Sequence, residues 1–472
     1  MNESSNSPDP ANYLEEHFDR FVDELLEFLA IPSISALPDH APHVDRAARW
    51  VADRLVAAGI GQVEELRAGG VPAVYGEWLE AGEQAPTILV YGHFDTQPVD
   101  PLELWSQPPF SPVIRDERIY ARGASDDKGN MLIPILATEA CLQTRGALPL
   151  NVKFLFEGEE EVGSPHIEEL LEQNRERLEC DYVVSADGGQ WSESQSNLLV
   201  GFKGLCAVEI DVVGPNRDLH SGLFGGTVQN PIHALSRIIA SMRDDEGRVL
   251  VEGFYDQVVT PDEEDRRQVA AVPHDDVTFA ANLEVEELFG EPGFSTLERN
   301  WCRPTLEVNG IWGGFTGDGV KTVLPAEAHA KITCRLVPDQ DPRTVAECLR
   351  EHVASHLPPG VTATVSISES GAAPYLVPSD HPGNQAAGDV LTEIYGRAPF
   401  FTRSGGTLPI CSALKRLLDV YTVIFSFALD DERAHSPDEF FRLSSFRRGQ
   451  LAWTRLFERI GADGSTASIS DN

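Results

Sequence analysis

The sequence of 472 residues has few basic residues, with 37 Lys and Arg against 75 Asp and Glu and a formal net charge of −38. A chain this acidic is repelled by nucleic acids and anionic membranes, so neither is an expected partner. No apolar run is long enough to span a bilayer, and residues 1–20 lack the basic and apolar regions of a signal peptide. The seven cysteines are scattered without a C-x-x-C, which argues against a disulfide framework or a cysteine zinc site. We therefore expect a cytoplasmic protein.

The chain is too long for one comfortable hydrophobic core, so two domains are expected. Apolar runs without alternation are typical of strands buried on both faces of a mostly parallel sheet. Such runs lie at 85–92, 150–156, 181–187 and 420–428. Helical spacing of apolar residues predicts helices at 12–31 and 43–59. Polar clusters follow the predicted strands, at the edge where open α/β sheets form their sites.

A different pattern begins near Gly201 and predicts a small α+β layer inserted into the larger domain. Its expected strands are 204–214, 326–338 and 361–370, and its expected helices are 230–244 and 343–357. The larger domain resumes with a helix at 381–396, and residues 461–472 are expected to form a loose tail. The predicted domains are therefore 1–202 and 376–472, which form one catalytic domain, and 203–375, the insertion.

Three polar clusters follow predicted strands or precede helices, and each also has an ordinary structural explanation. His93 and Asp95 in "GHFDTQP" lie two residues apart, so both can point to one side; either Asp95 orients a metal-bound His93, or the pair at the strand end is incidental. Asp126 in "ASDDKG" is either a carboxylate held between two cations or a helix N-cap. In "FEGEEEVGS" (156–164), three adjacent glutamates would repel one another unless a cation lies among them. The alternative is a solvated acidic helix start.

Two further candidates complete a group that contains no sulfur. Asp187 is the last residue of the apolar run at 181–187, and His435 lies in the loop after the strand at 420–428. Imidazoles mixed with carboxylates suit zinc, with manganese or cobalt as alternatives, and a shared carboxylate suits a pair of metals. The residues alone therefore point to a centre of two divalent metal ions.

The motifs together give the chain a clear resemblance. It resembles the co-catalytic zinc peptidase family that includes carnosinases, carboxypeptidase G, acetylornithine deacetylase and succinyl-diaminopimelate desuccinylase, and within it the carnosinase-like dipeptidases. The matching stretches, in the family's order and over nearly the whole chain, are "GHFDTQP", "WSQPPFSPVIRDERIYARGASDDKG", "FEGEEEVGS", "SADGG", "DLHSGLFGG", "RLVPDQ", "RSGGTLPI" and "AHSPDE". The resemblance implies an α/β, phosphorylase/hydrolase-like catalytic domain with a mostly parallel sheet, and an inserted α+β (ferredoxin-like) lid and dimerisation domain.

The resemblance also implies roles for individual residues. The expected metal ligands are His93 and Asp187 for one ion, Glu161 and His435 for the other, and Asp126 as the bridge. Glu160 falls on the family's general base and Asp95 on the residue that steadies His93. The Asp126–Asp127 peptide bond is expected to be cis. Glu159 is expected to take no part, and Glu157 has no assigned role.

In the insertion, His220 falls on the family histidine that reaches across a homodimer interface to polarise the scissile carbonyl; otherwise it is a surface histidine. Thr322 and Arg335 resemble the residues that hold the substrate's C-terminal carboxylate, and a planar guanidinium suits this task. A strand-face salt bridge is the alternative for Arg335. Gly406 and Thr407 are expected to line the substrate cleft, with Thr407 standing where the family often has serine.

The expected activity is that of a dinuclear metal dipeptidase acting on small peptides with a free C-terminal carboxylate. The alternative enzyme is an amidohydrolase that removes an acyl or carbamoyl group from an amino acid. A binding or scaffold protein of the same fold would lack a ligand or the base, and the sequence retains all of them. The acidic stretch "TPDEEDRRQVAAVPHDDV" (260–277) has no assigned role.

Overall fold

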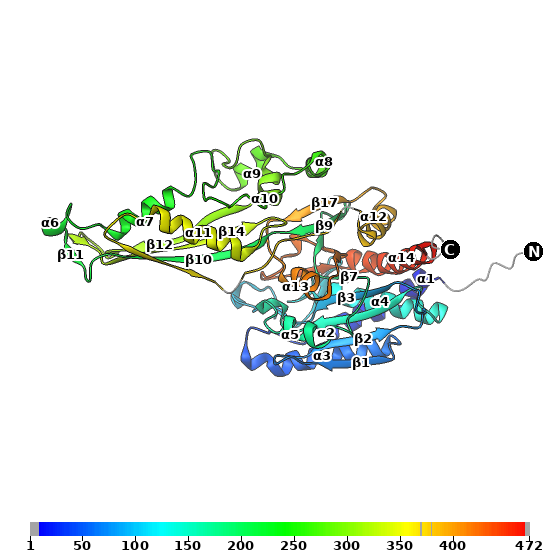
Figure 1. The fold of residues 1–472 in the computed structure, drawn as a ribbon. Coiled ribbons are helices and arrows are strands. Elements are labelled where there is room, and N and C mark those ends of the chain that lie inside the picture. Colours follow the sequence, from blue (N-terminus) through cyan, green and yellow to red (C-terminus); the bar gives the residue numbers. More distant parts are fainter. Residues whose placement is uncertain (1–8, 369–370, 379, 468–472) are drawn as a thin grey trace, which may run out of the picture. The chain divides into compact units, whose positions relative to one another are not determined.

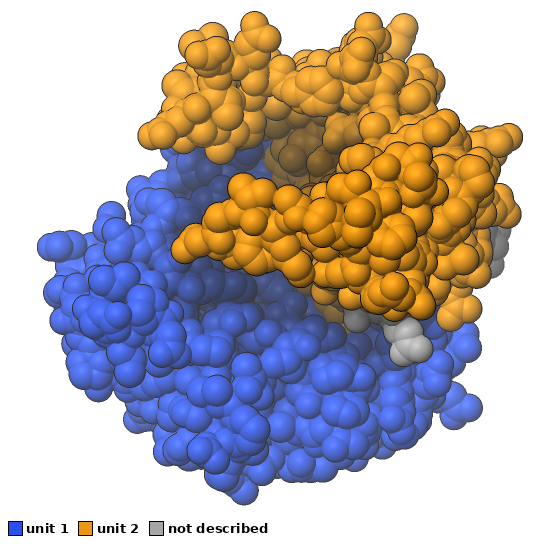
Figure 2. Space-filling view, turned by 90° about the vertical axis from the view of Figure 1, so that its left-hand side faces the viewer, with its two compact units in different colours: residues 1–200, 377–401, 413–472 blue, residues 201–376, 402–412 orange. Residues whose placement is uncertain are grey.

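The computed structural model describes residues 9–368, 371–378 and 380–467 and separates the chain into two compact units (Figure 2). Unit 1 contains the described residues of 1–200, 377–401 and 413–472, and unit 2 contains those of 201–376 and 402–412. The segment 402–412 thus lies in unit 2, whereas the domains predicted from the sequence place it in 376–472, the second part of the catalytic domain. The predicted domain boundaries stay a prediction. In the described residues, no helix combines the length and the apolar character needed to cross a membrane.

Unit 1 is built on a six-stranded sheet in the order β1-β2-β6-β3-β7-β18 (Figure 1). The strands are β1 (Gln62–Leu66), β2 (Ala73–Trp78), β6 (Asn151–Glu157), β3 (Thr87–His93), β7 (Tyr182–Ser185) and β18 (Thr422–Ile424). β3 pairs in parallel with β6 and β7, and β18 pairs in parallel with β7, while β1 and β2 are antiparallel. The predicted mostly parallel sheet is confirmed, and β1 and β2, which the apolar runs did not reveal, extend it at one side through antiparallel pairing.

Helices pack along this sheet because its central strands are apolar on both faces; all seven residues of β6 are buried. α3 packs on β1 and β2, α4 packs on β3, and α14 lies along α4 (Figure 1). The helices of unit 1 are α1 (Pro10–Glu16), α2 (Phe18–Leu29), α3 (Ala41–Ala57), α4 (Lys128–Arg145), α5 (Ile167–Gln173), α12 (Pro382–Tyr395) and α14 (Leu443–Ala467), with 3₁₀ turns at Pro38–His40, Leu102–Leu104, Glu160–Val162 and Asp430–Glu432. α13 (Pro409–Leu418) continues from unit 2 into unit 1.

Two predicted boundaries at the ends of the chain were wrong. The single helix expected at 12–31 is divided into α1 and α2 at His17, whose ring Nδ1 lies 2.9 Å from the carbonyl oxygen of Tyr13. The tail expected to be loose from 461 is helical through Ala467. It forms the end of α14, whose side chains Trp453 and Phe457 are buried earlier in the helix. The rest of that tail, 468–472, lies outside the described residues.

Unit 2 contains an antiparallel four-stranded sheet in the order β12-β14-β10-β15. These strands are β12 (Thr305–Gly313), β14 (Glu327–Leu336), β10 (Gly204–Val213) and β15 (Thr362–Ile367). α7 (Pro231–Ala240) and α11 (Pro342–His356) pack on it, so the predicted inserted α+β domain is confirmed. The remaining helices are α6 (Ser221–Phe224), α8 (Glu263–Ala271), α9 (Asp276–Asn282) and α10 (Thr296–Cys302).

Short strands complete the two units. They are β4 (Val113–Arg115), β5 (Arg118–Tyr120), β8 (Gly189–Gln190), β19 (Ala428–Leu429) and β20 (Phe440–Arg442) in unit 1, β11 (Leu219–His220), β13 (Val323–Leu324) and β16 (Tyr375–Leu376) in unit 2, and β9 (Asn197–Phe202) and β17 (Phe400–Ser404), which run from one unit into the other. Strands β16, β9 and β17 form a three-stranded sheet.

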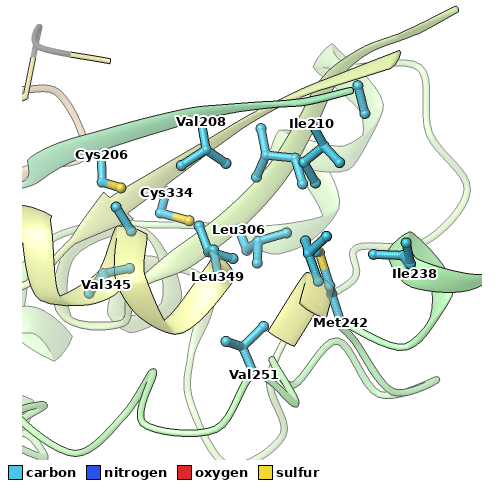
Figure 3. Packing of buried hydrophobic residues seen from close by; sticks show 14 of the residues in the cluster. Cys206, Val208, Ile210, Ile238, Met242, Val251, Leu306, Cys334, Val345 and Leu349 are labelled. Carbon is cyan, nitrogen blue, oxygen red and sulfur yellow. The ribbon is translucent and has the colours of Figure 1, made fainter. Parts of the chain in front are cut away.

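The core of unit 2 lies between its sheet and helices α7 and α11 (Figure 3). β10 alternates buried and partly exposed residues, so Val208 and Ile210 point to one side of the sheet. There they belong to the same buried cluster as Leu306 of β12 and Leu349 of α11. Burying each such side chain contributes about 1.5–3 kcal/mol, so this unit has a core of its own to hold its loops in place.

Candidate metal centre

The five predicted metal ligands all belong to unit 1 and follow from its strand ends. His93 is the last residue of β3, and Asp187 lies two residues beyond β7. Asp126 precedes α4, Glu161 lies in the 3₁₀ turn after β6, and His435 follows the 3₁₀ turn Asp430–Glu432. Because parallel strands end at the same edge of the sheet, residues far apart in sequence converge there.

The geometry forms two groups that share Asp126. Potential ligand atoms of His93, Asp126 and Asp187 lie within 4.8 Å of one another, as do those of Asp126, Glu161 and His435. Asp126 Oδ1 is 3.0 Å from His93 Nε2, and its Oδ2 is 2.8 Å from His435 Nε2. Glu161 Oε2 is 3.1 Å from His435 Nε2. Two nitrogen and three carboxylate donors around a shared carboxylate fit a pair of divalent cations.

The charges of this cluster also fit bound cations. Hydrogen bonds to Asp126 and Glu161 raise the pKa of His435 to about 10. Burial opposes the charged form of His93, yet hydrogen bonds to Asp126 and Asp95 raise its pKa well above the usual range. Both shifts have the same cause, because the surrounding carboxylates favour positive charge at this position. Divalent cations would supply that charge and need the imidazoles in their neutral form.

Asp95 organises the centre from behind. Its carboxylate is fully buried, with Oδ1 3.3 Å from His93 Nδ1, which leaves Nε2 facing Asp126. The same carboxylate accepts the backbone N–H of Glu160 (3.3 Å, Oδ1) and of Glu161 (3.1 Å, Oδ2). One side chain thus orients the imidazole and fixes the register of two successive glutamates.

The glutamates of residues 156–164 have different surroundings. Glu159 turns to His166, whose Nδ1 lies 2.8 Å from its carboxylate. Glu157 is buried and accepts the hydroxyl of Tyr91 at 2.6 Å, and burial raises its pKa to about 7. Burial also raises the pKa of Glu160 to about 8, and the neighbouring carboxylates shift this pKa in the same direction. A raised pKa makes Glu160 suited to accepting a proton near neutral pH.

Beside Asp126 the backbone has the predicted conformation, because the Asp126–Asp127 peptide bond is cis. Asp127 is fully buried, and its Oδ2 accepts the backbone N–H of His93 at 3.2 Å. Its side chain therefore connects the turn that carries Asp126 to the end of β3.

Sequence reasoning missed Glu439, which lies in the quoted motif "AHSPDE" without an assigned role. Its fully buried carboxylate accepts a hydrogen bond from Arg122 Nη1 (2.7 Å) and backbone N–H bonds from Gly123 (3.0 Å), Ser125 (2.9 Å) and Asp126 (3.2 Å). Four donors converging on one buried carboxylate hold the turn that presents Asp126. In the sequence, the only indication that Glu439 takes part in the site is its place in this motif, close to His435.

The predicted residues of the insertion lie in unit 2 and form two groups. Arg335 Nη1 donates to Thr407 Oγ1 at 2.6 Å, beside Gly406. Within the described residues, the recorded side-chain contact of Arg335 is this hydrogen bond, and the alternative of a strand-face salt bridge stays a prediction.

The second group of unit 2 contains His220 and Thr322. Strands β11 and β13 pair, and the carbonyl oxygen of Thr322 accepts the N–H of Ser221 at 3.0 Å. The Nδ1 of the exposed His220 accepts the N–H of Gly222 at 3.0 Å. The neutral ring therefore carries its proton on Nε2, which is free to donate.

A parallel α/β sheet with imidazoles and carboxylates converging at its carboxyl edge, interrupted by an α+β insertion, defines an α/β metallohydrolase. Comparison with known families is more specific. The family model described as peptidase family M20/M25/M40 matches residues 89–459, and the chain belongs to this peptidase family.

Relatives match over nearly their full length. The chain is 31% identical to the Cys-Gly metallodipeptidase dug1 of Schizosaccharomyces pombe, covering 92% of this chain and 94% of that protein. It is 30% identical to the Beta-Ala-His dipeptidase of Homo sapiens, covering 96% and 94%. Among solved structures, the M20 family metallo-carboxypeptidase Sso-CP2 of Sulfolobus solfataricus is 31% identical and superposes with a TM-score of 0.78, covering 94% of this chain and all of that one.

Proposed function

We propose that the protein is a metal-dependent dipeptidase that hydrolyses small peptides with a free C-terminal carboxylate. The observation that carries this proposal is the centre in which Asp126 faces both His93 and His435, beside the half-buried Glu160. Full-length similarity to two metallodipeptidases supports it over removal of acyl groups from amino acids.

His93, Asp126, Asp187, Glu161 and His435 would hold two divalent metal ions. Zinc is the proposed metal, with manganese and cobalt as alternatives, since all three accept imidazole and carboxylate ligands. The bound ions would polarise the scissile carbonyl and lower the pKa of the attacking water. We propose a cytoplasmic location, which the seven free cysteines support because disulfides persist in oxidising compartments.

The chain's own residues would then move the proton and hold the substrate. Glu160 accepts the proton of the attacking water and delivers it to the leaving amine. His220 donates its Nε2–H to the oxygen of the scissile carbonyl as negative charge develops there. Arg335 and Thr407 bind the C-terminal carboxylate, since the half-buried guanidinium forms no ion pair with a carboxylate in the described ranges and so offers a charge-assisted bond. Thr322 and Gly406 complete the proposed substrate contacts.

The test is a substrate panel on protein reconstituted with zinc or manganese. It compares free dipeptides, the same dipeptides as C-terminal amides, N-acetyl amino acids and N-acetylated tripeptides. We expect free dipeptides to have the highest kcat/KM, and amidation to lower it about 10- to 100-fold, because one charged hydrogen bond contributes about 1.5–3 kcal/mol. Preferred hydrolysis of N-acetyl amino acids would contradict the dipeptidase proposal, and preferred hydrolysis of N-acetylated tripeptides would indicate a carboxypeptidase.

We also propose that the enzyme is a homodimer in which His220 acts in the partner's active site. Two apolar side chains near His220 and Thr322 in sequence are strongly exposed: Leu223 is 74% exposed and Val320 is 94% exposed. Apolar side chains gathered at one surface are typical of protein interfaces.

Complementation tests this arrangement. His220→Ala and Glu160→Gln each abolish activity, but a mixture exchanged between subunits contains heterodimers with one intact site made from both chains. We expect about a quarter of wild-type activity, since random exchange makes half the dimers mixed, each with one functional site of two. No recovery, with mixed dimers verified by mass spectrometry, would place His220 in its own subunit's site.

A further inference from the structure

The acidic stretch 260–277, which the function leaves without a role, is folded against the loop that carries Gly406 and Thr407. It belongs to the segment between α7 and β12, which adds α8, α9 and α10 to the four-stranded sheet of unit 2. Helix α8 begins with a capping box in which Asp262 and Asp265 each accept the other's backbone N–H. The acidic residues at this helix start therefore have local partners.

Asp265 makes a second contact that the cap does not require. While its Oδ2 accepts the N–H of Asp262 at 3.3 Å, its Oδ1 forms an ion pair with Nη2 of Arg403. The Arg403 side chain is only 13% exposed, and its Nη1 lies 3.5 Å from Cys302 Sγ of α10. The pair is thus largely shielded from water. Solvent and salt screen such a pair less than an ion pair on the surface.

Arg403 directly precedes the loop 404–407, and two further contacts hold that loop. The backbone N–H of Lys203 lies 3.2 Å from the carbonyl oxygen of Ser404 and 2.9 Å from that of Gly406. The Lys203 ammonium donates to the carbonyl oxygen of Arg299 in α10 at 3.3 Å.

On its other side the loop lies close against α10. A side chain at Gly405 would come within 2.7 Å of Asn300 Oδ1, so the backbone there packs directly on that helix. The loop is therefore anchored at its start by α8 and along its length by α10.

At its far end the loop meets the proposed carboxylate-binding residues, since Thr407 Oγ1 accepts the hydrogen bond of Arg335 Nη1. Two arginines therefore approach this loop with different partners. Arg403 forms an ion pair with Asp265, whereas Arg335 donates to the neutral hydroxyl of Thr407 and forms no ion pair within the part of the chain that the structure describes. This leaves the guanidinium of Arg335 available for an anionic ligand.

We propose that Asp265 is a positioning residue for recognition of the substrate's C-terminal carboxylate, an inference that rests on the proposed dipeptidase function. By holding Arg403, it fixes the loop so that Thr407 and Arg335 keep a common geometry. It also prevents Arg403 from competing for the substrate carboxylate. A displacement of about 1 Å in a substrate-binding group lowers kcat/KM up to about 100-fold, so the anchor influences substrate recognition without touching the substrate.

The test replaces Asp265 with Asn, which keeps an oxygen to accept the N–H of Asp262 but removes the charge facing Arg403. We expect KM for a free dipeptide to rise about tenfold with kcat within about threefold, because uniform substrate binding is weakened. The ratio of kcat/KM between the free dipeptide and its amide should fall by about the same factor. Asp262→Asn, which changes the cap but not the Arg403 pair, is the matched control and should keep wild-type KM.

A second measurement separates positioning from a general loss of structure. In the Arg335→Lys background, Asp265→Asn should raise KM by less than about twofold, since residues acting through one group are not additive. Equal losses for dipeptide and amide, or additive effects with Arg335→Lys, would overturn the inference. Wild-type protein that hydrolyses no dipeptide would contradict the proposed function, whereas an active wild type with unchanged KM in Asp265→Asn contradicts the inference alone.

Discussion

Replacing Glu160 with Gln lowers kcat by about a thousandfold or more while the protein keeps its bound metal, as expected for loss of a general base. Gln keeps the shape of the side chain and cannot accept the proton. The backbone of residue 160 should stay in place in this variant, because Asp95 accepts its N–H and the substitution does not change that hydrogen bond. Metal content by inductively coupled plasma mass spectrometry and steady-state kinetics on the same sample provide the measurement.

Neighbouring glutamates supply the controls for this variant. Glu159→Gln should retain wild-type kcat, since Glu159 turns to His166. Glu161→Gln should lose metal as well as activity, because Glu161 Oε2 lies beside His435 Nε2. If Glu160→Gln loses metal and Glu161→Gln keeps it, the two roles are exchanged. More than a few per cent residual activity in Glu160→Gln would exclude it as the base.

The positions of the candidate ligands could be predicted from the sequence because they depend on local pattern. Apolar runs locate β3, β6, β7 and β18, and polar residues follow where these strands end. The register of Glu160 and Glu161 could not be predicted from composition, which treats adjacent glutamates alike, and came only from the family resemblance. In the structure Asp95 binds both backbone N–H groups, a contact between residues 65 and 66 positions apart.

Other features escaped prediction for physical reasons that the sequence conceals. β1 reads "QVEEL" and has one buried residue, so it carries no apolar run. β12 contains a register shift between Val308 and Gly310, which breaks the alternation expected of a strand. The ion pair of Asp265 with Arg403 joins positions 138 residues apart, and charge alone cannot identify such partners in a chain with 75 acidic residues.

The second large effect concerns Glu439. Replacing it with Gln removes the charge that pairs with the buried Arg122 and turns one acceptor into a donor that faces backbone N–H groups. Breaking a buried ion pair by removing one partner destabilises a protein by about 3–5 kcal/mol. Because the same carboxylate accepts the N–H of Asp126, the turn that presents Asp126, the proposed bridging ligand, should also loosen. Partners of metal ligands typically contribute about 10- to 100-fold in metal affinity.

We therefore expect Glu439→Gln to weaken zinc binding about 10- to 100-fold, measured by competition with a chelator at a temperature where the variant is folded. Glu139→Gln is the matched control. Glu139 is also a buried carboxylate of unit 1, paired with Arg20 and Arg54, and it belongs to the middle of α4, away from the Asp126 turn. The Glu139→Gln variant should have a lower free energy of unfolding in a urea titration and an unchanged zinc affinity. If both variants lose stability and neither loses zinc affinity, Glu439 stabilises the fold and does not position Asp126.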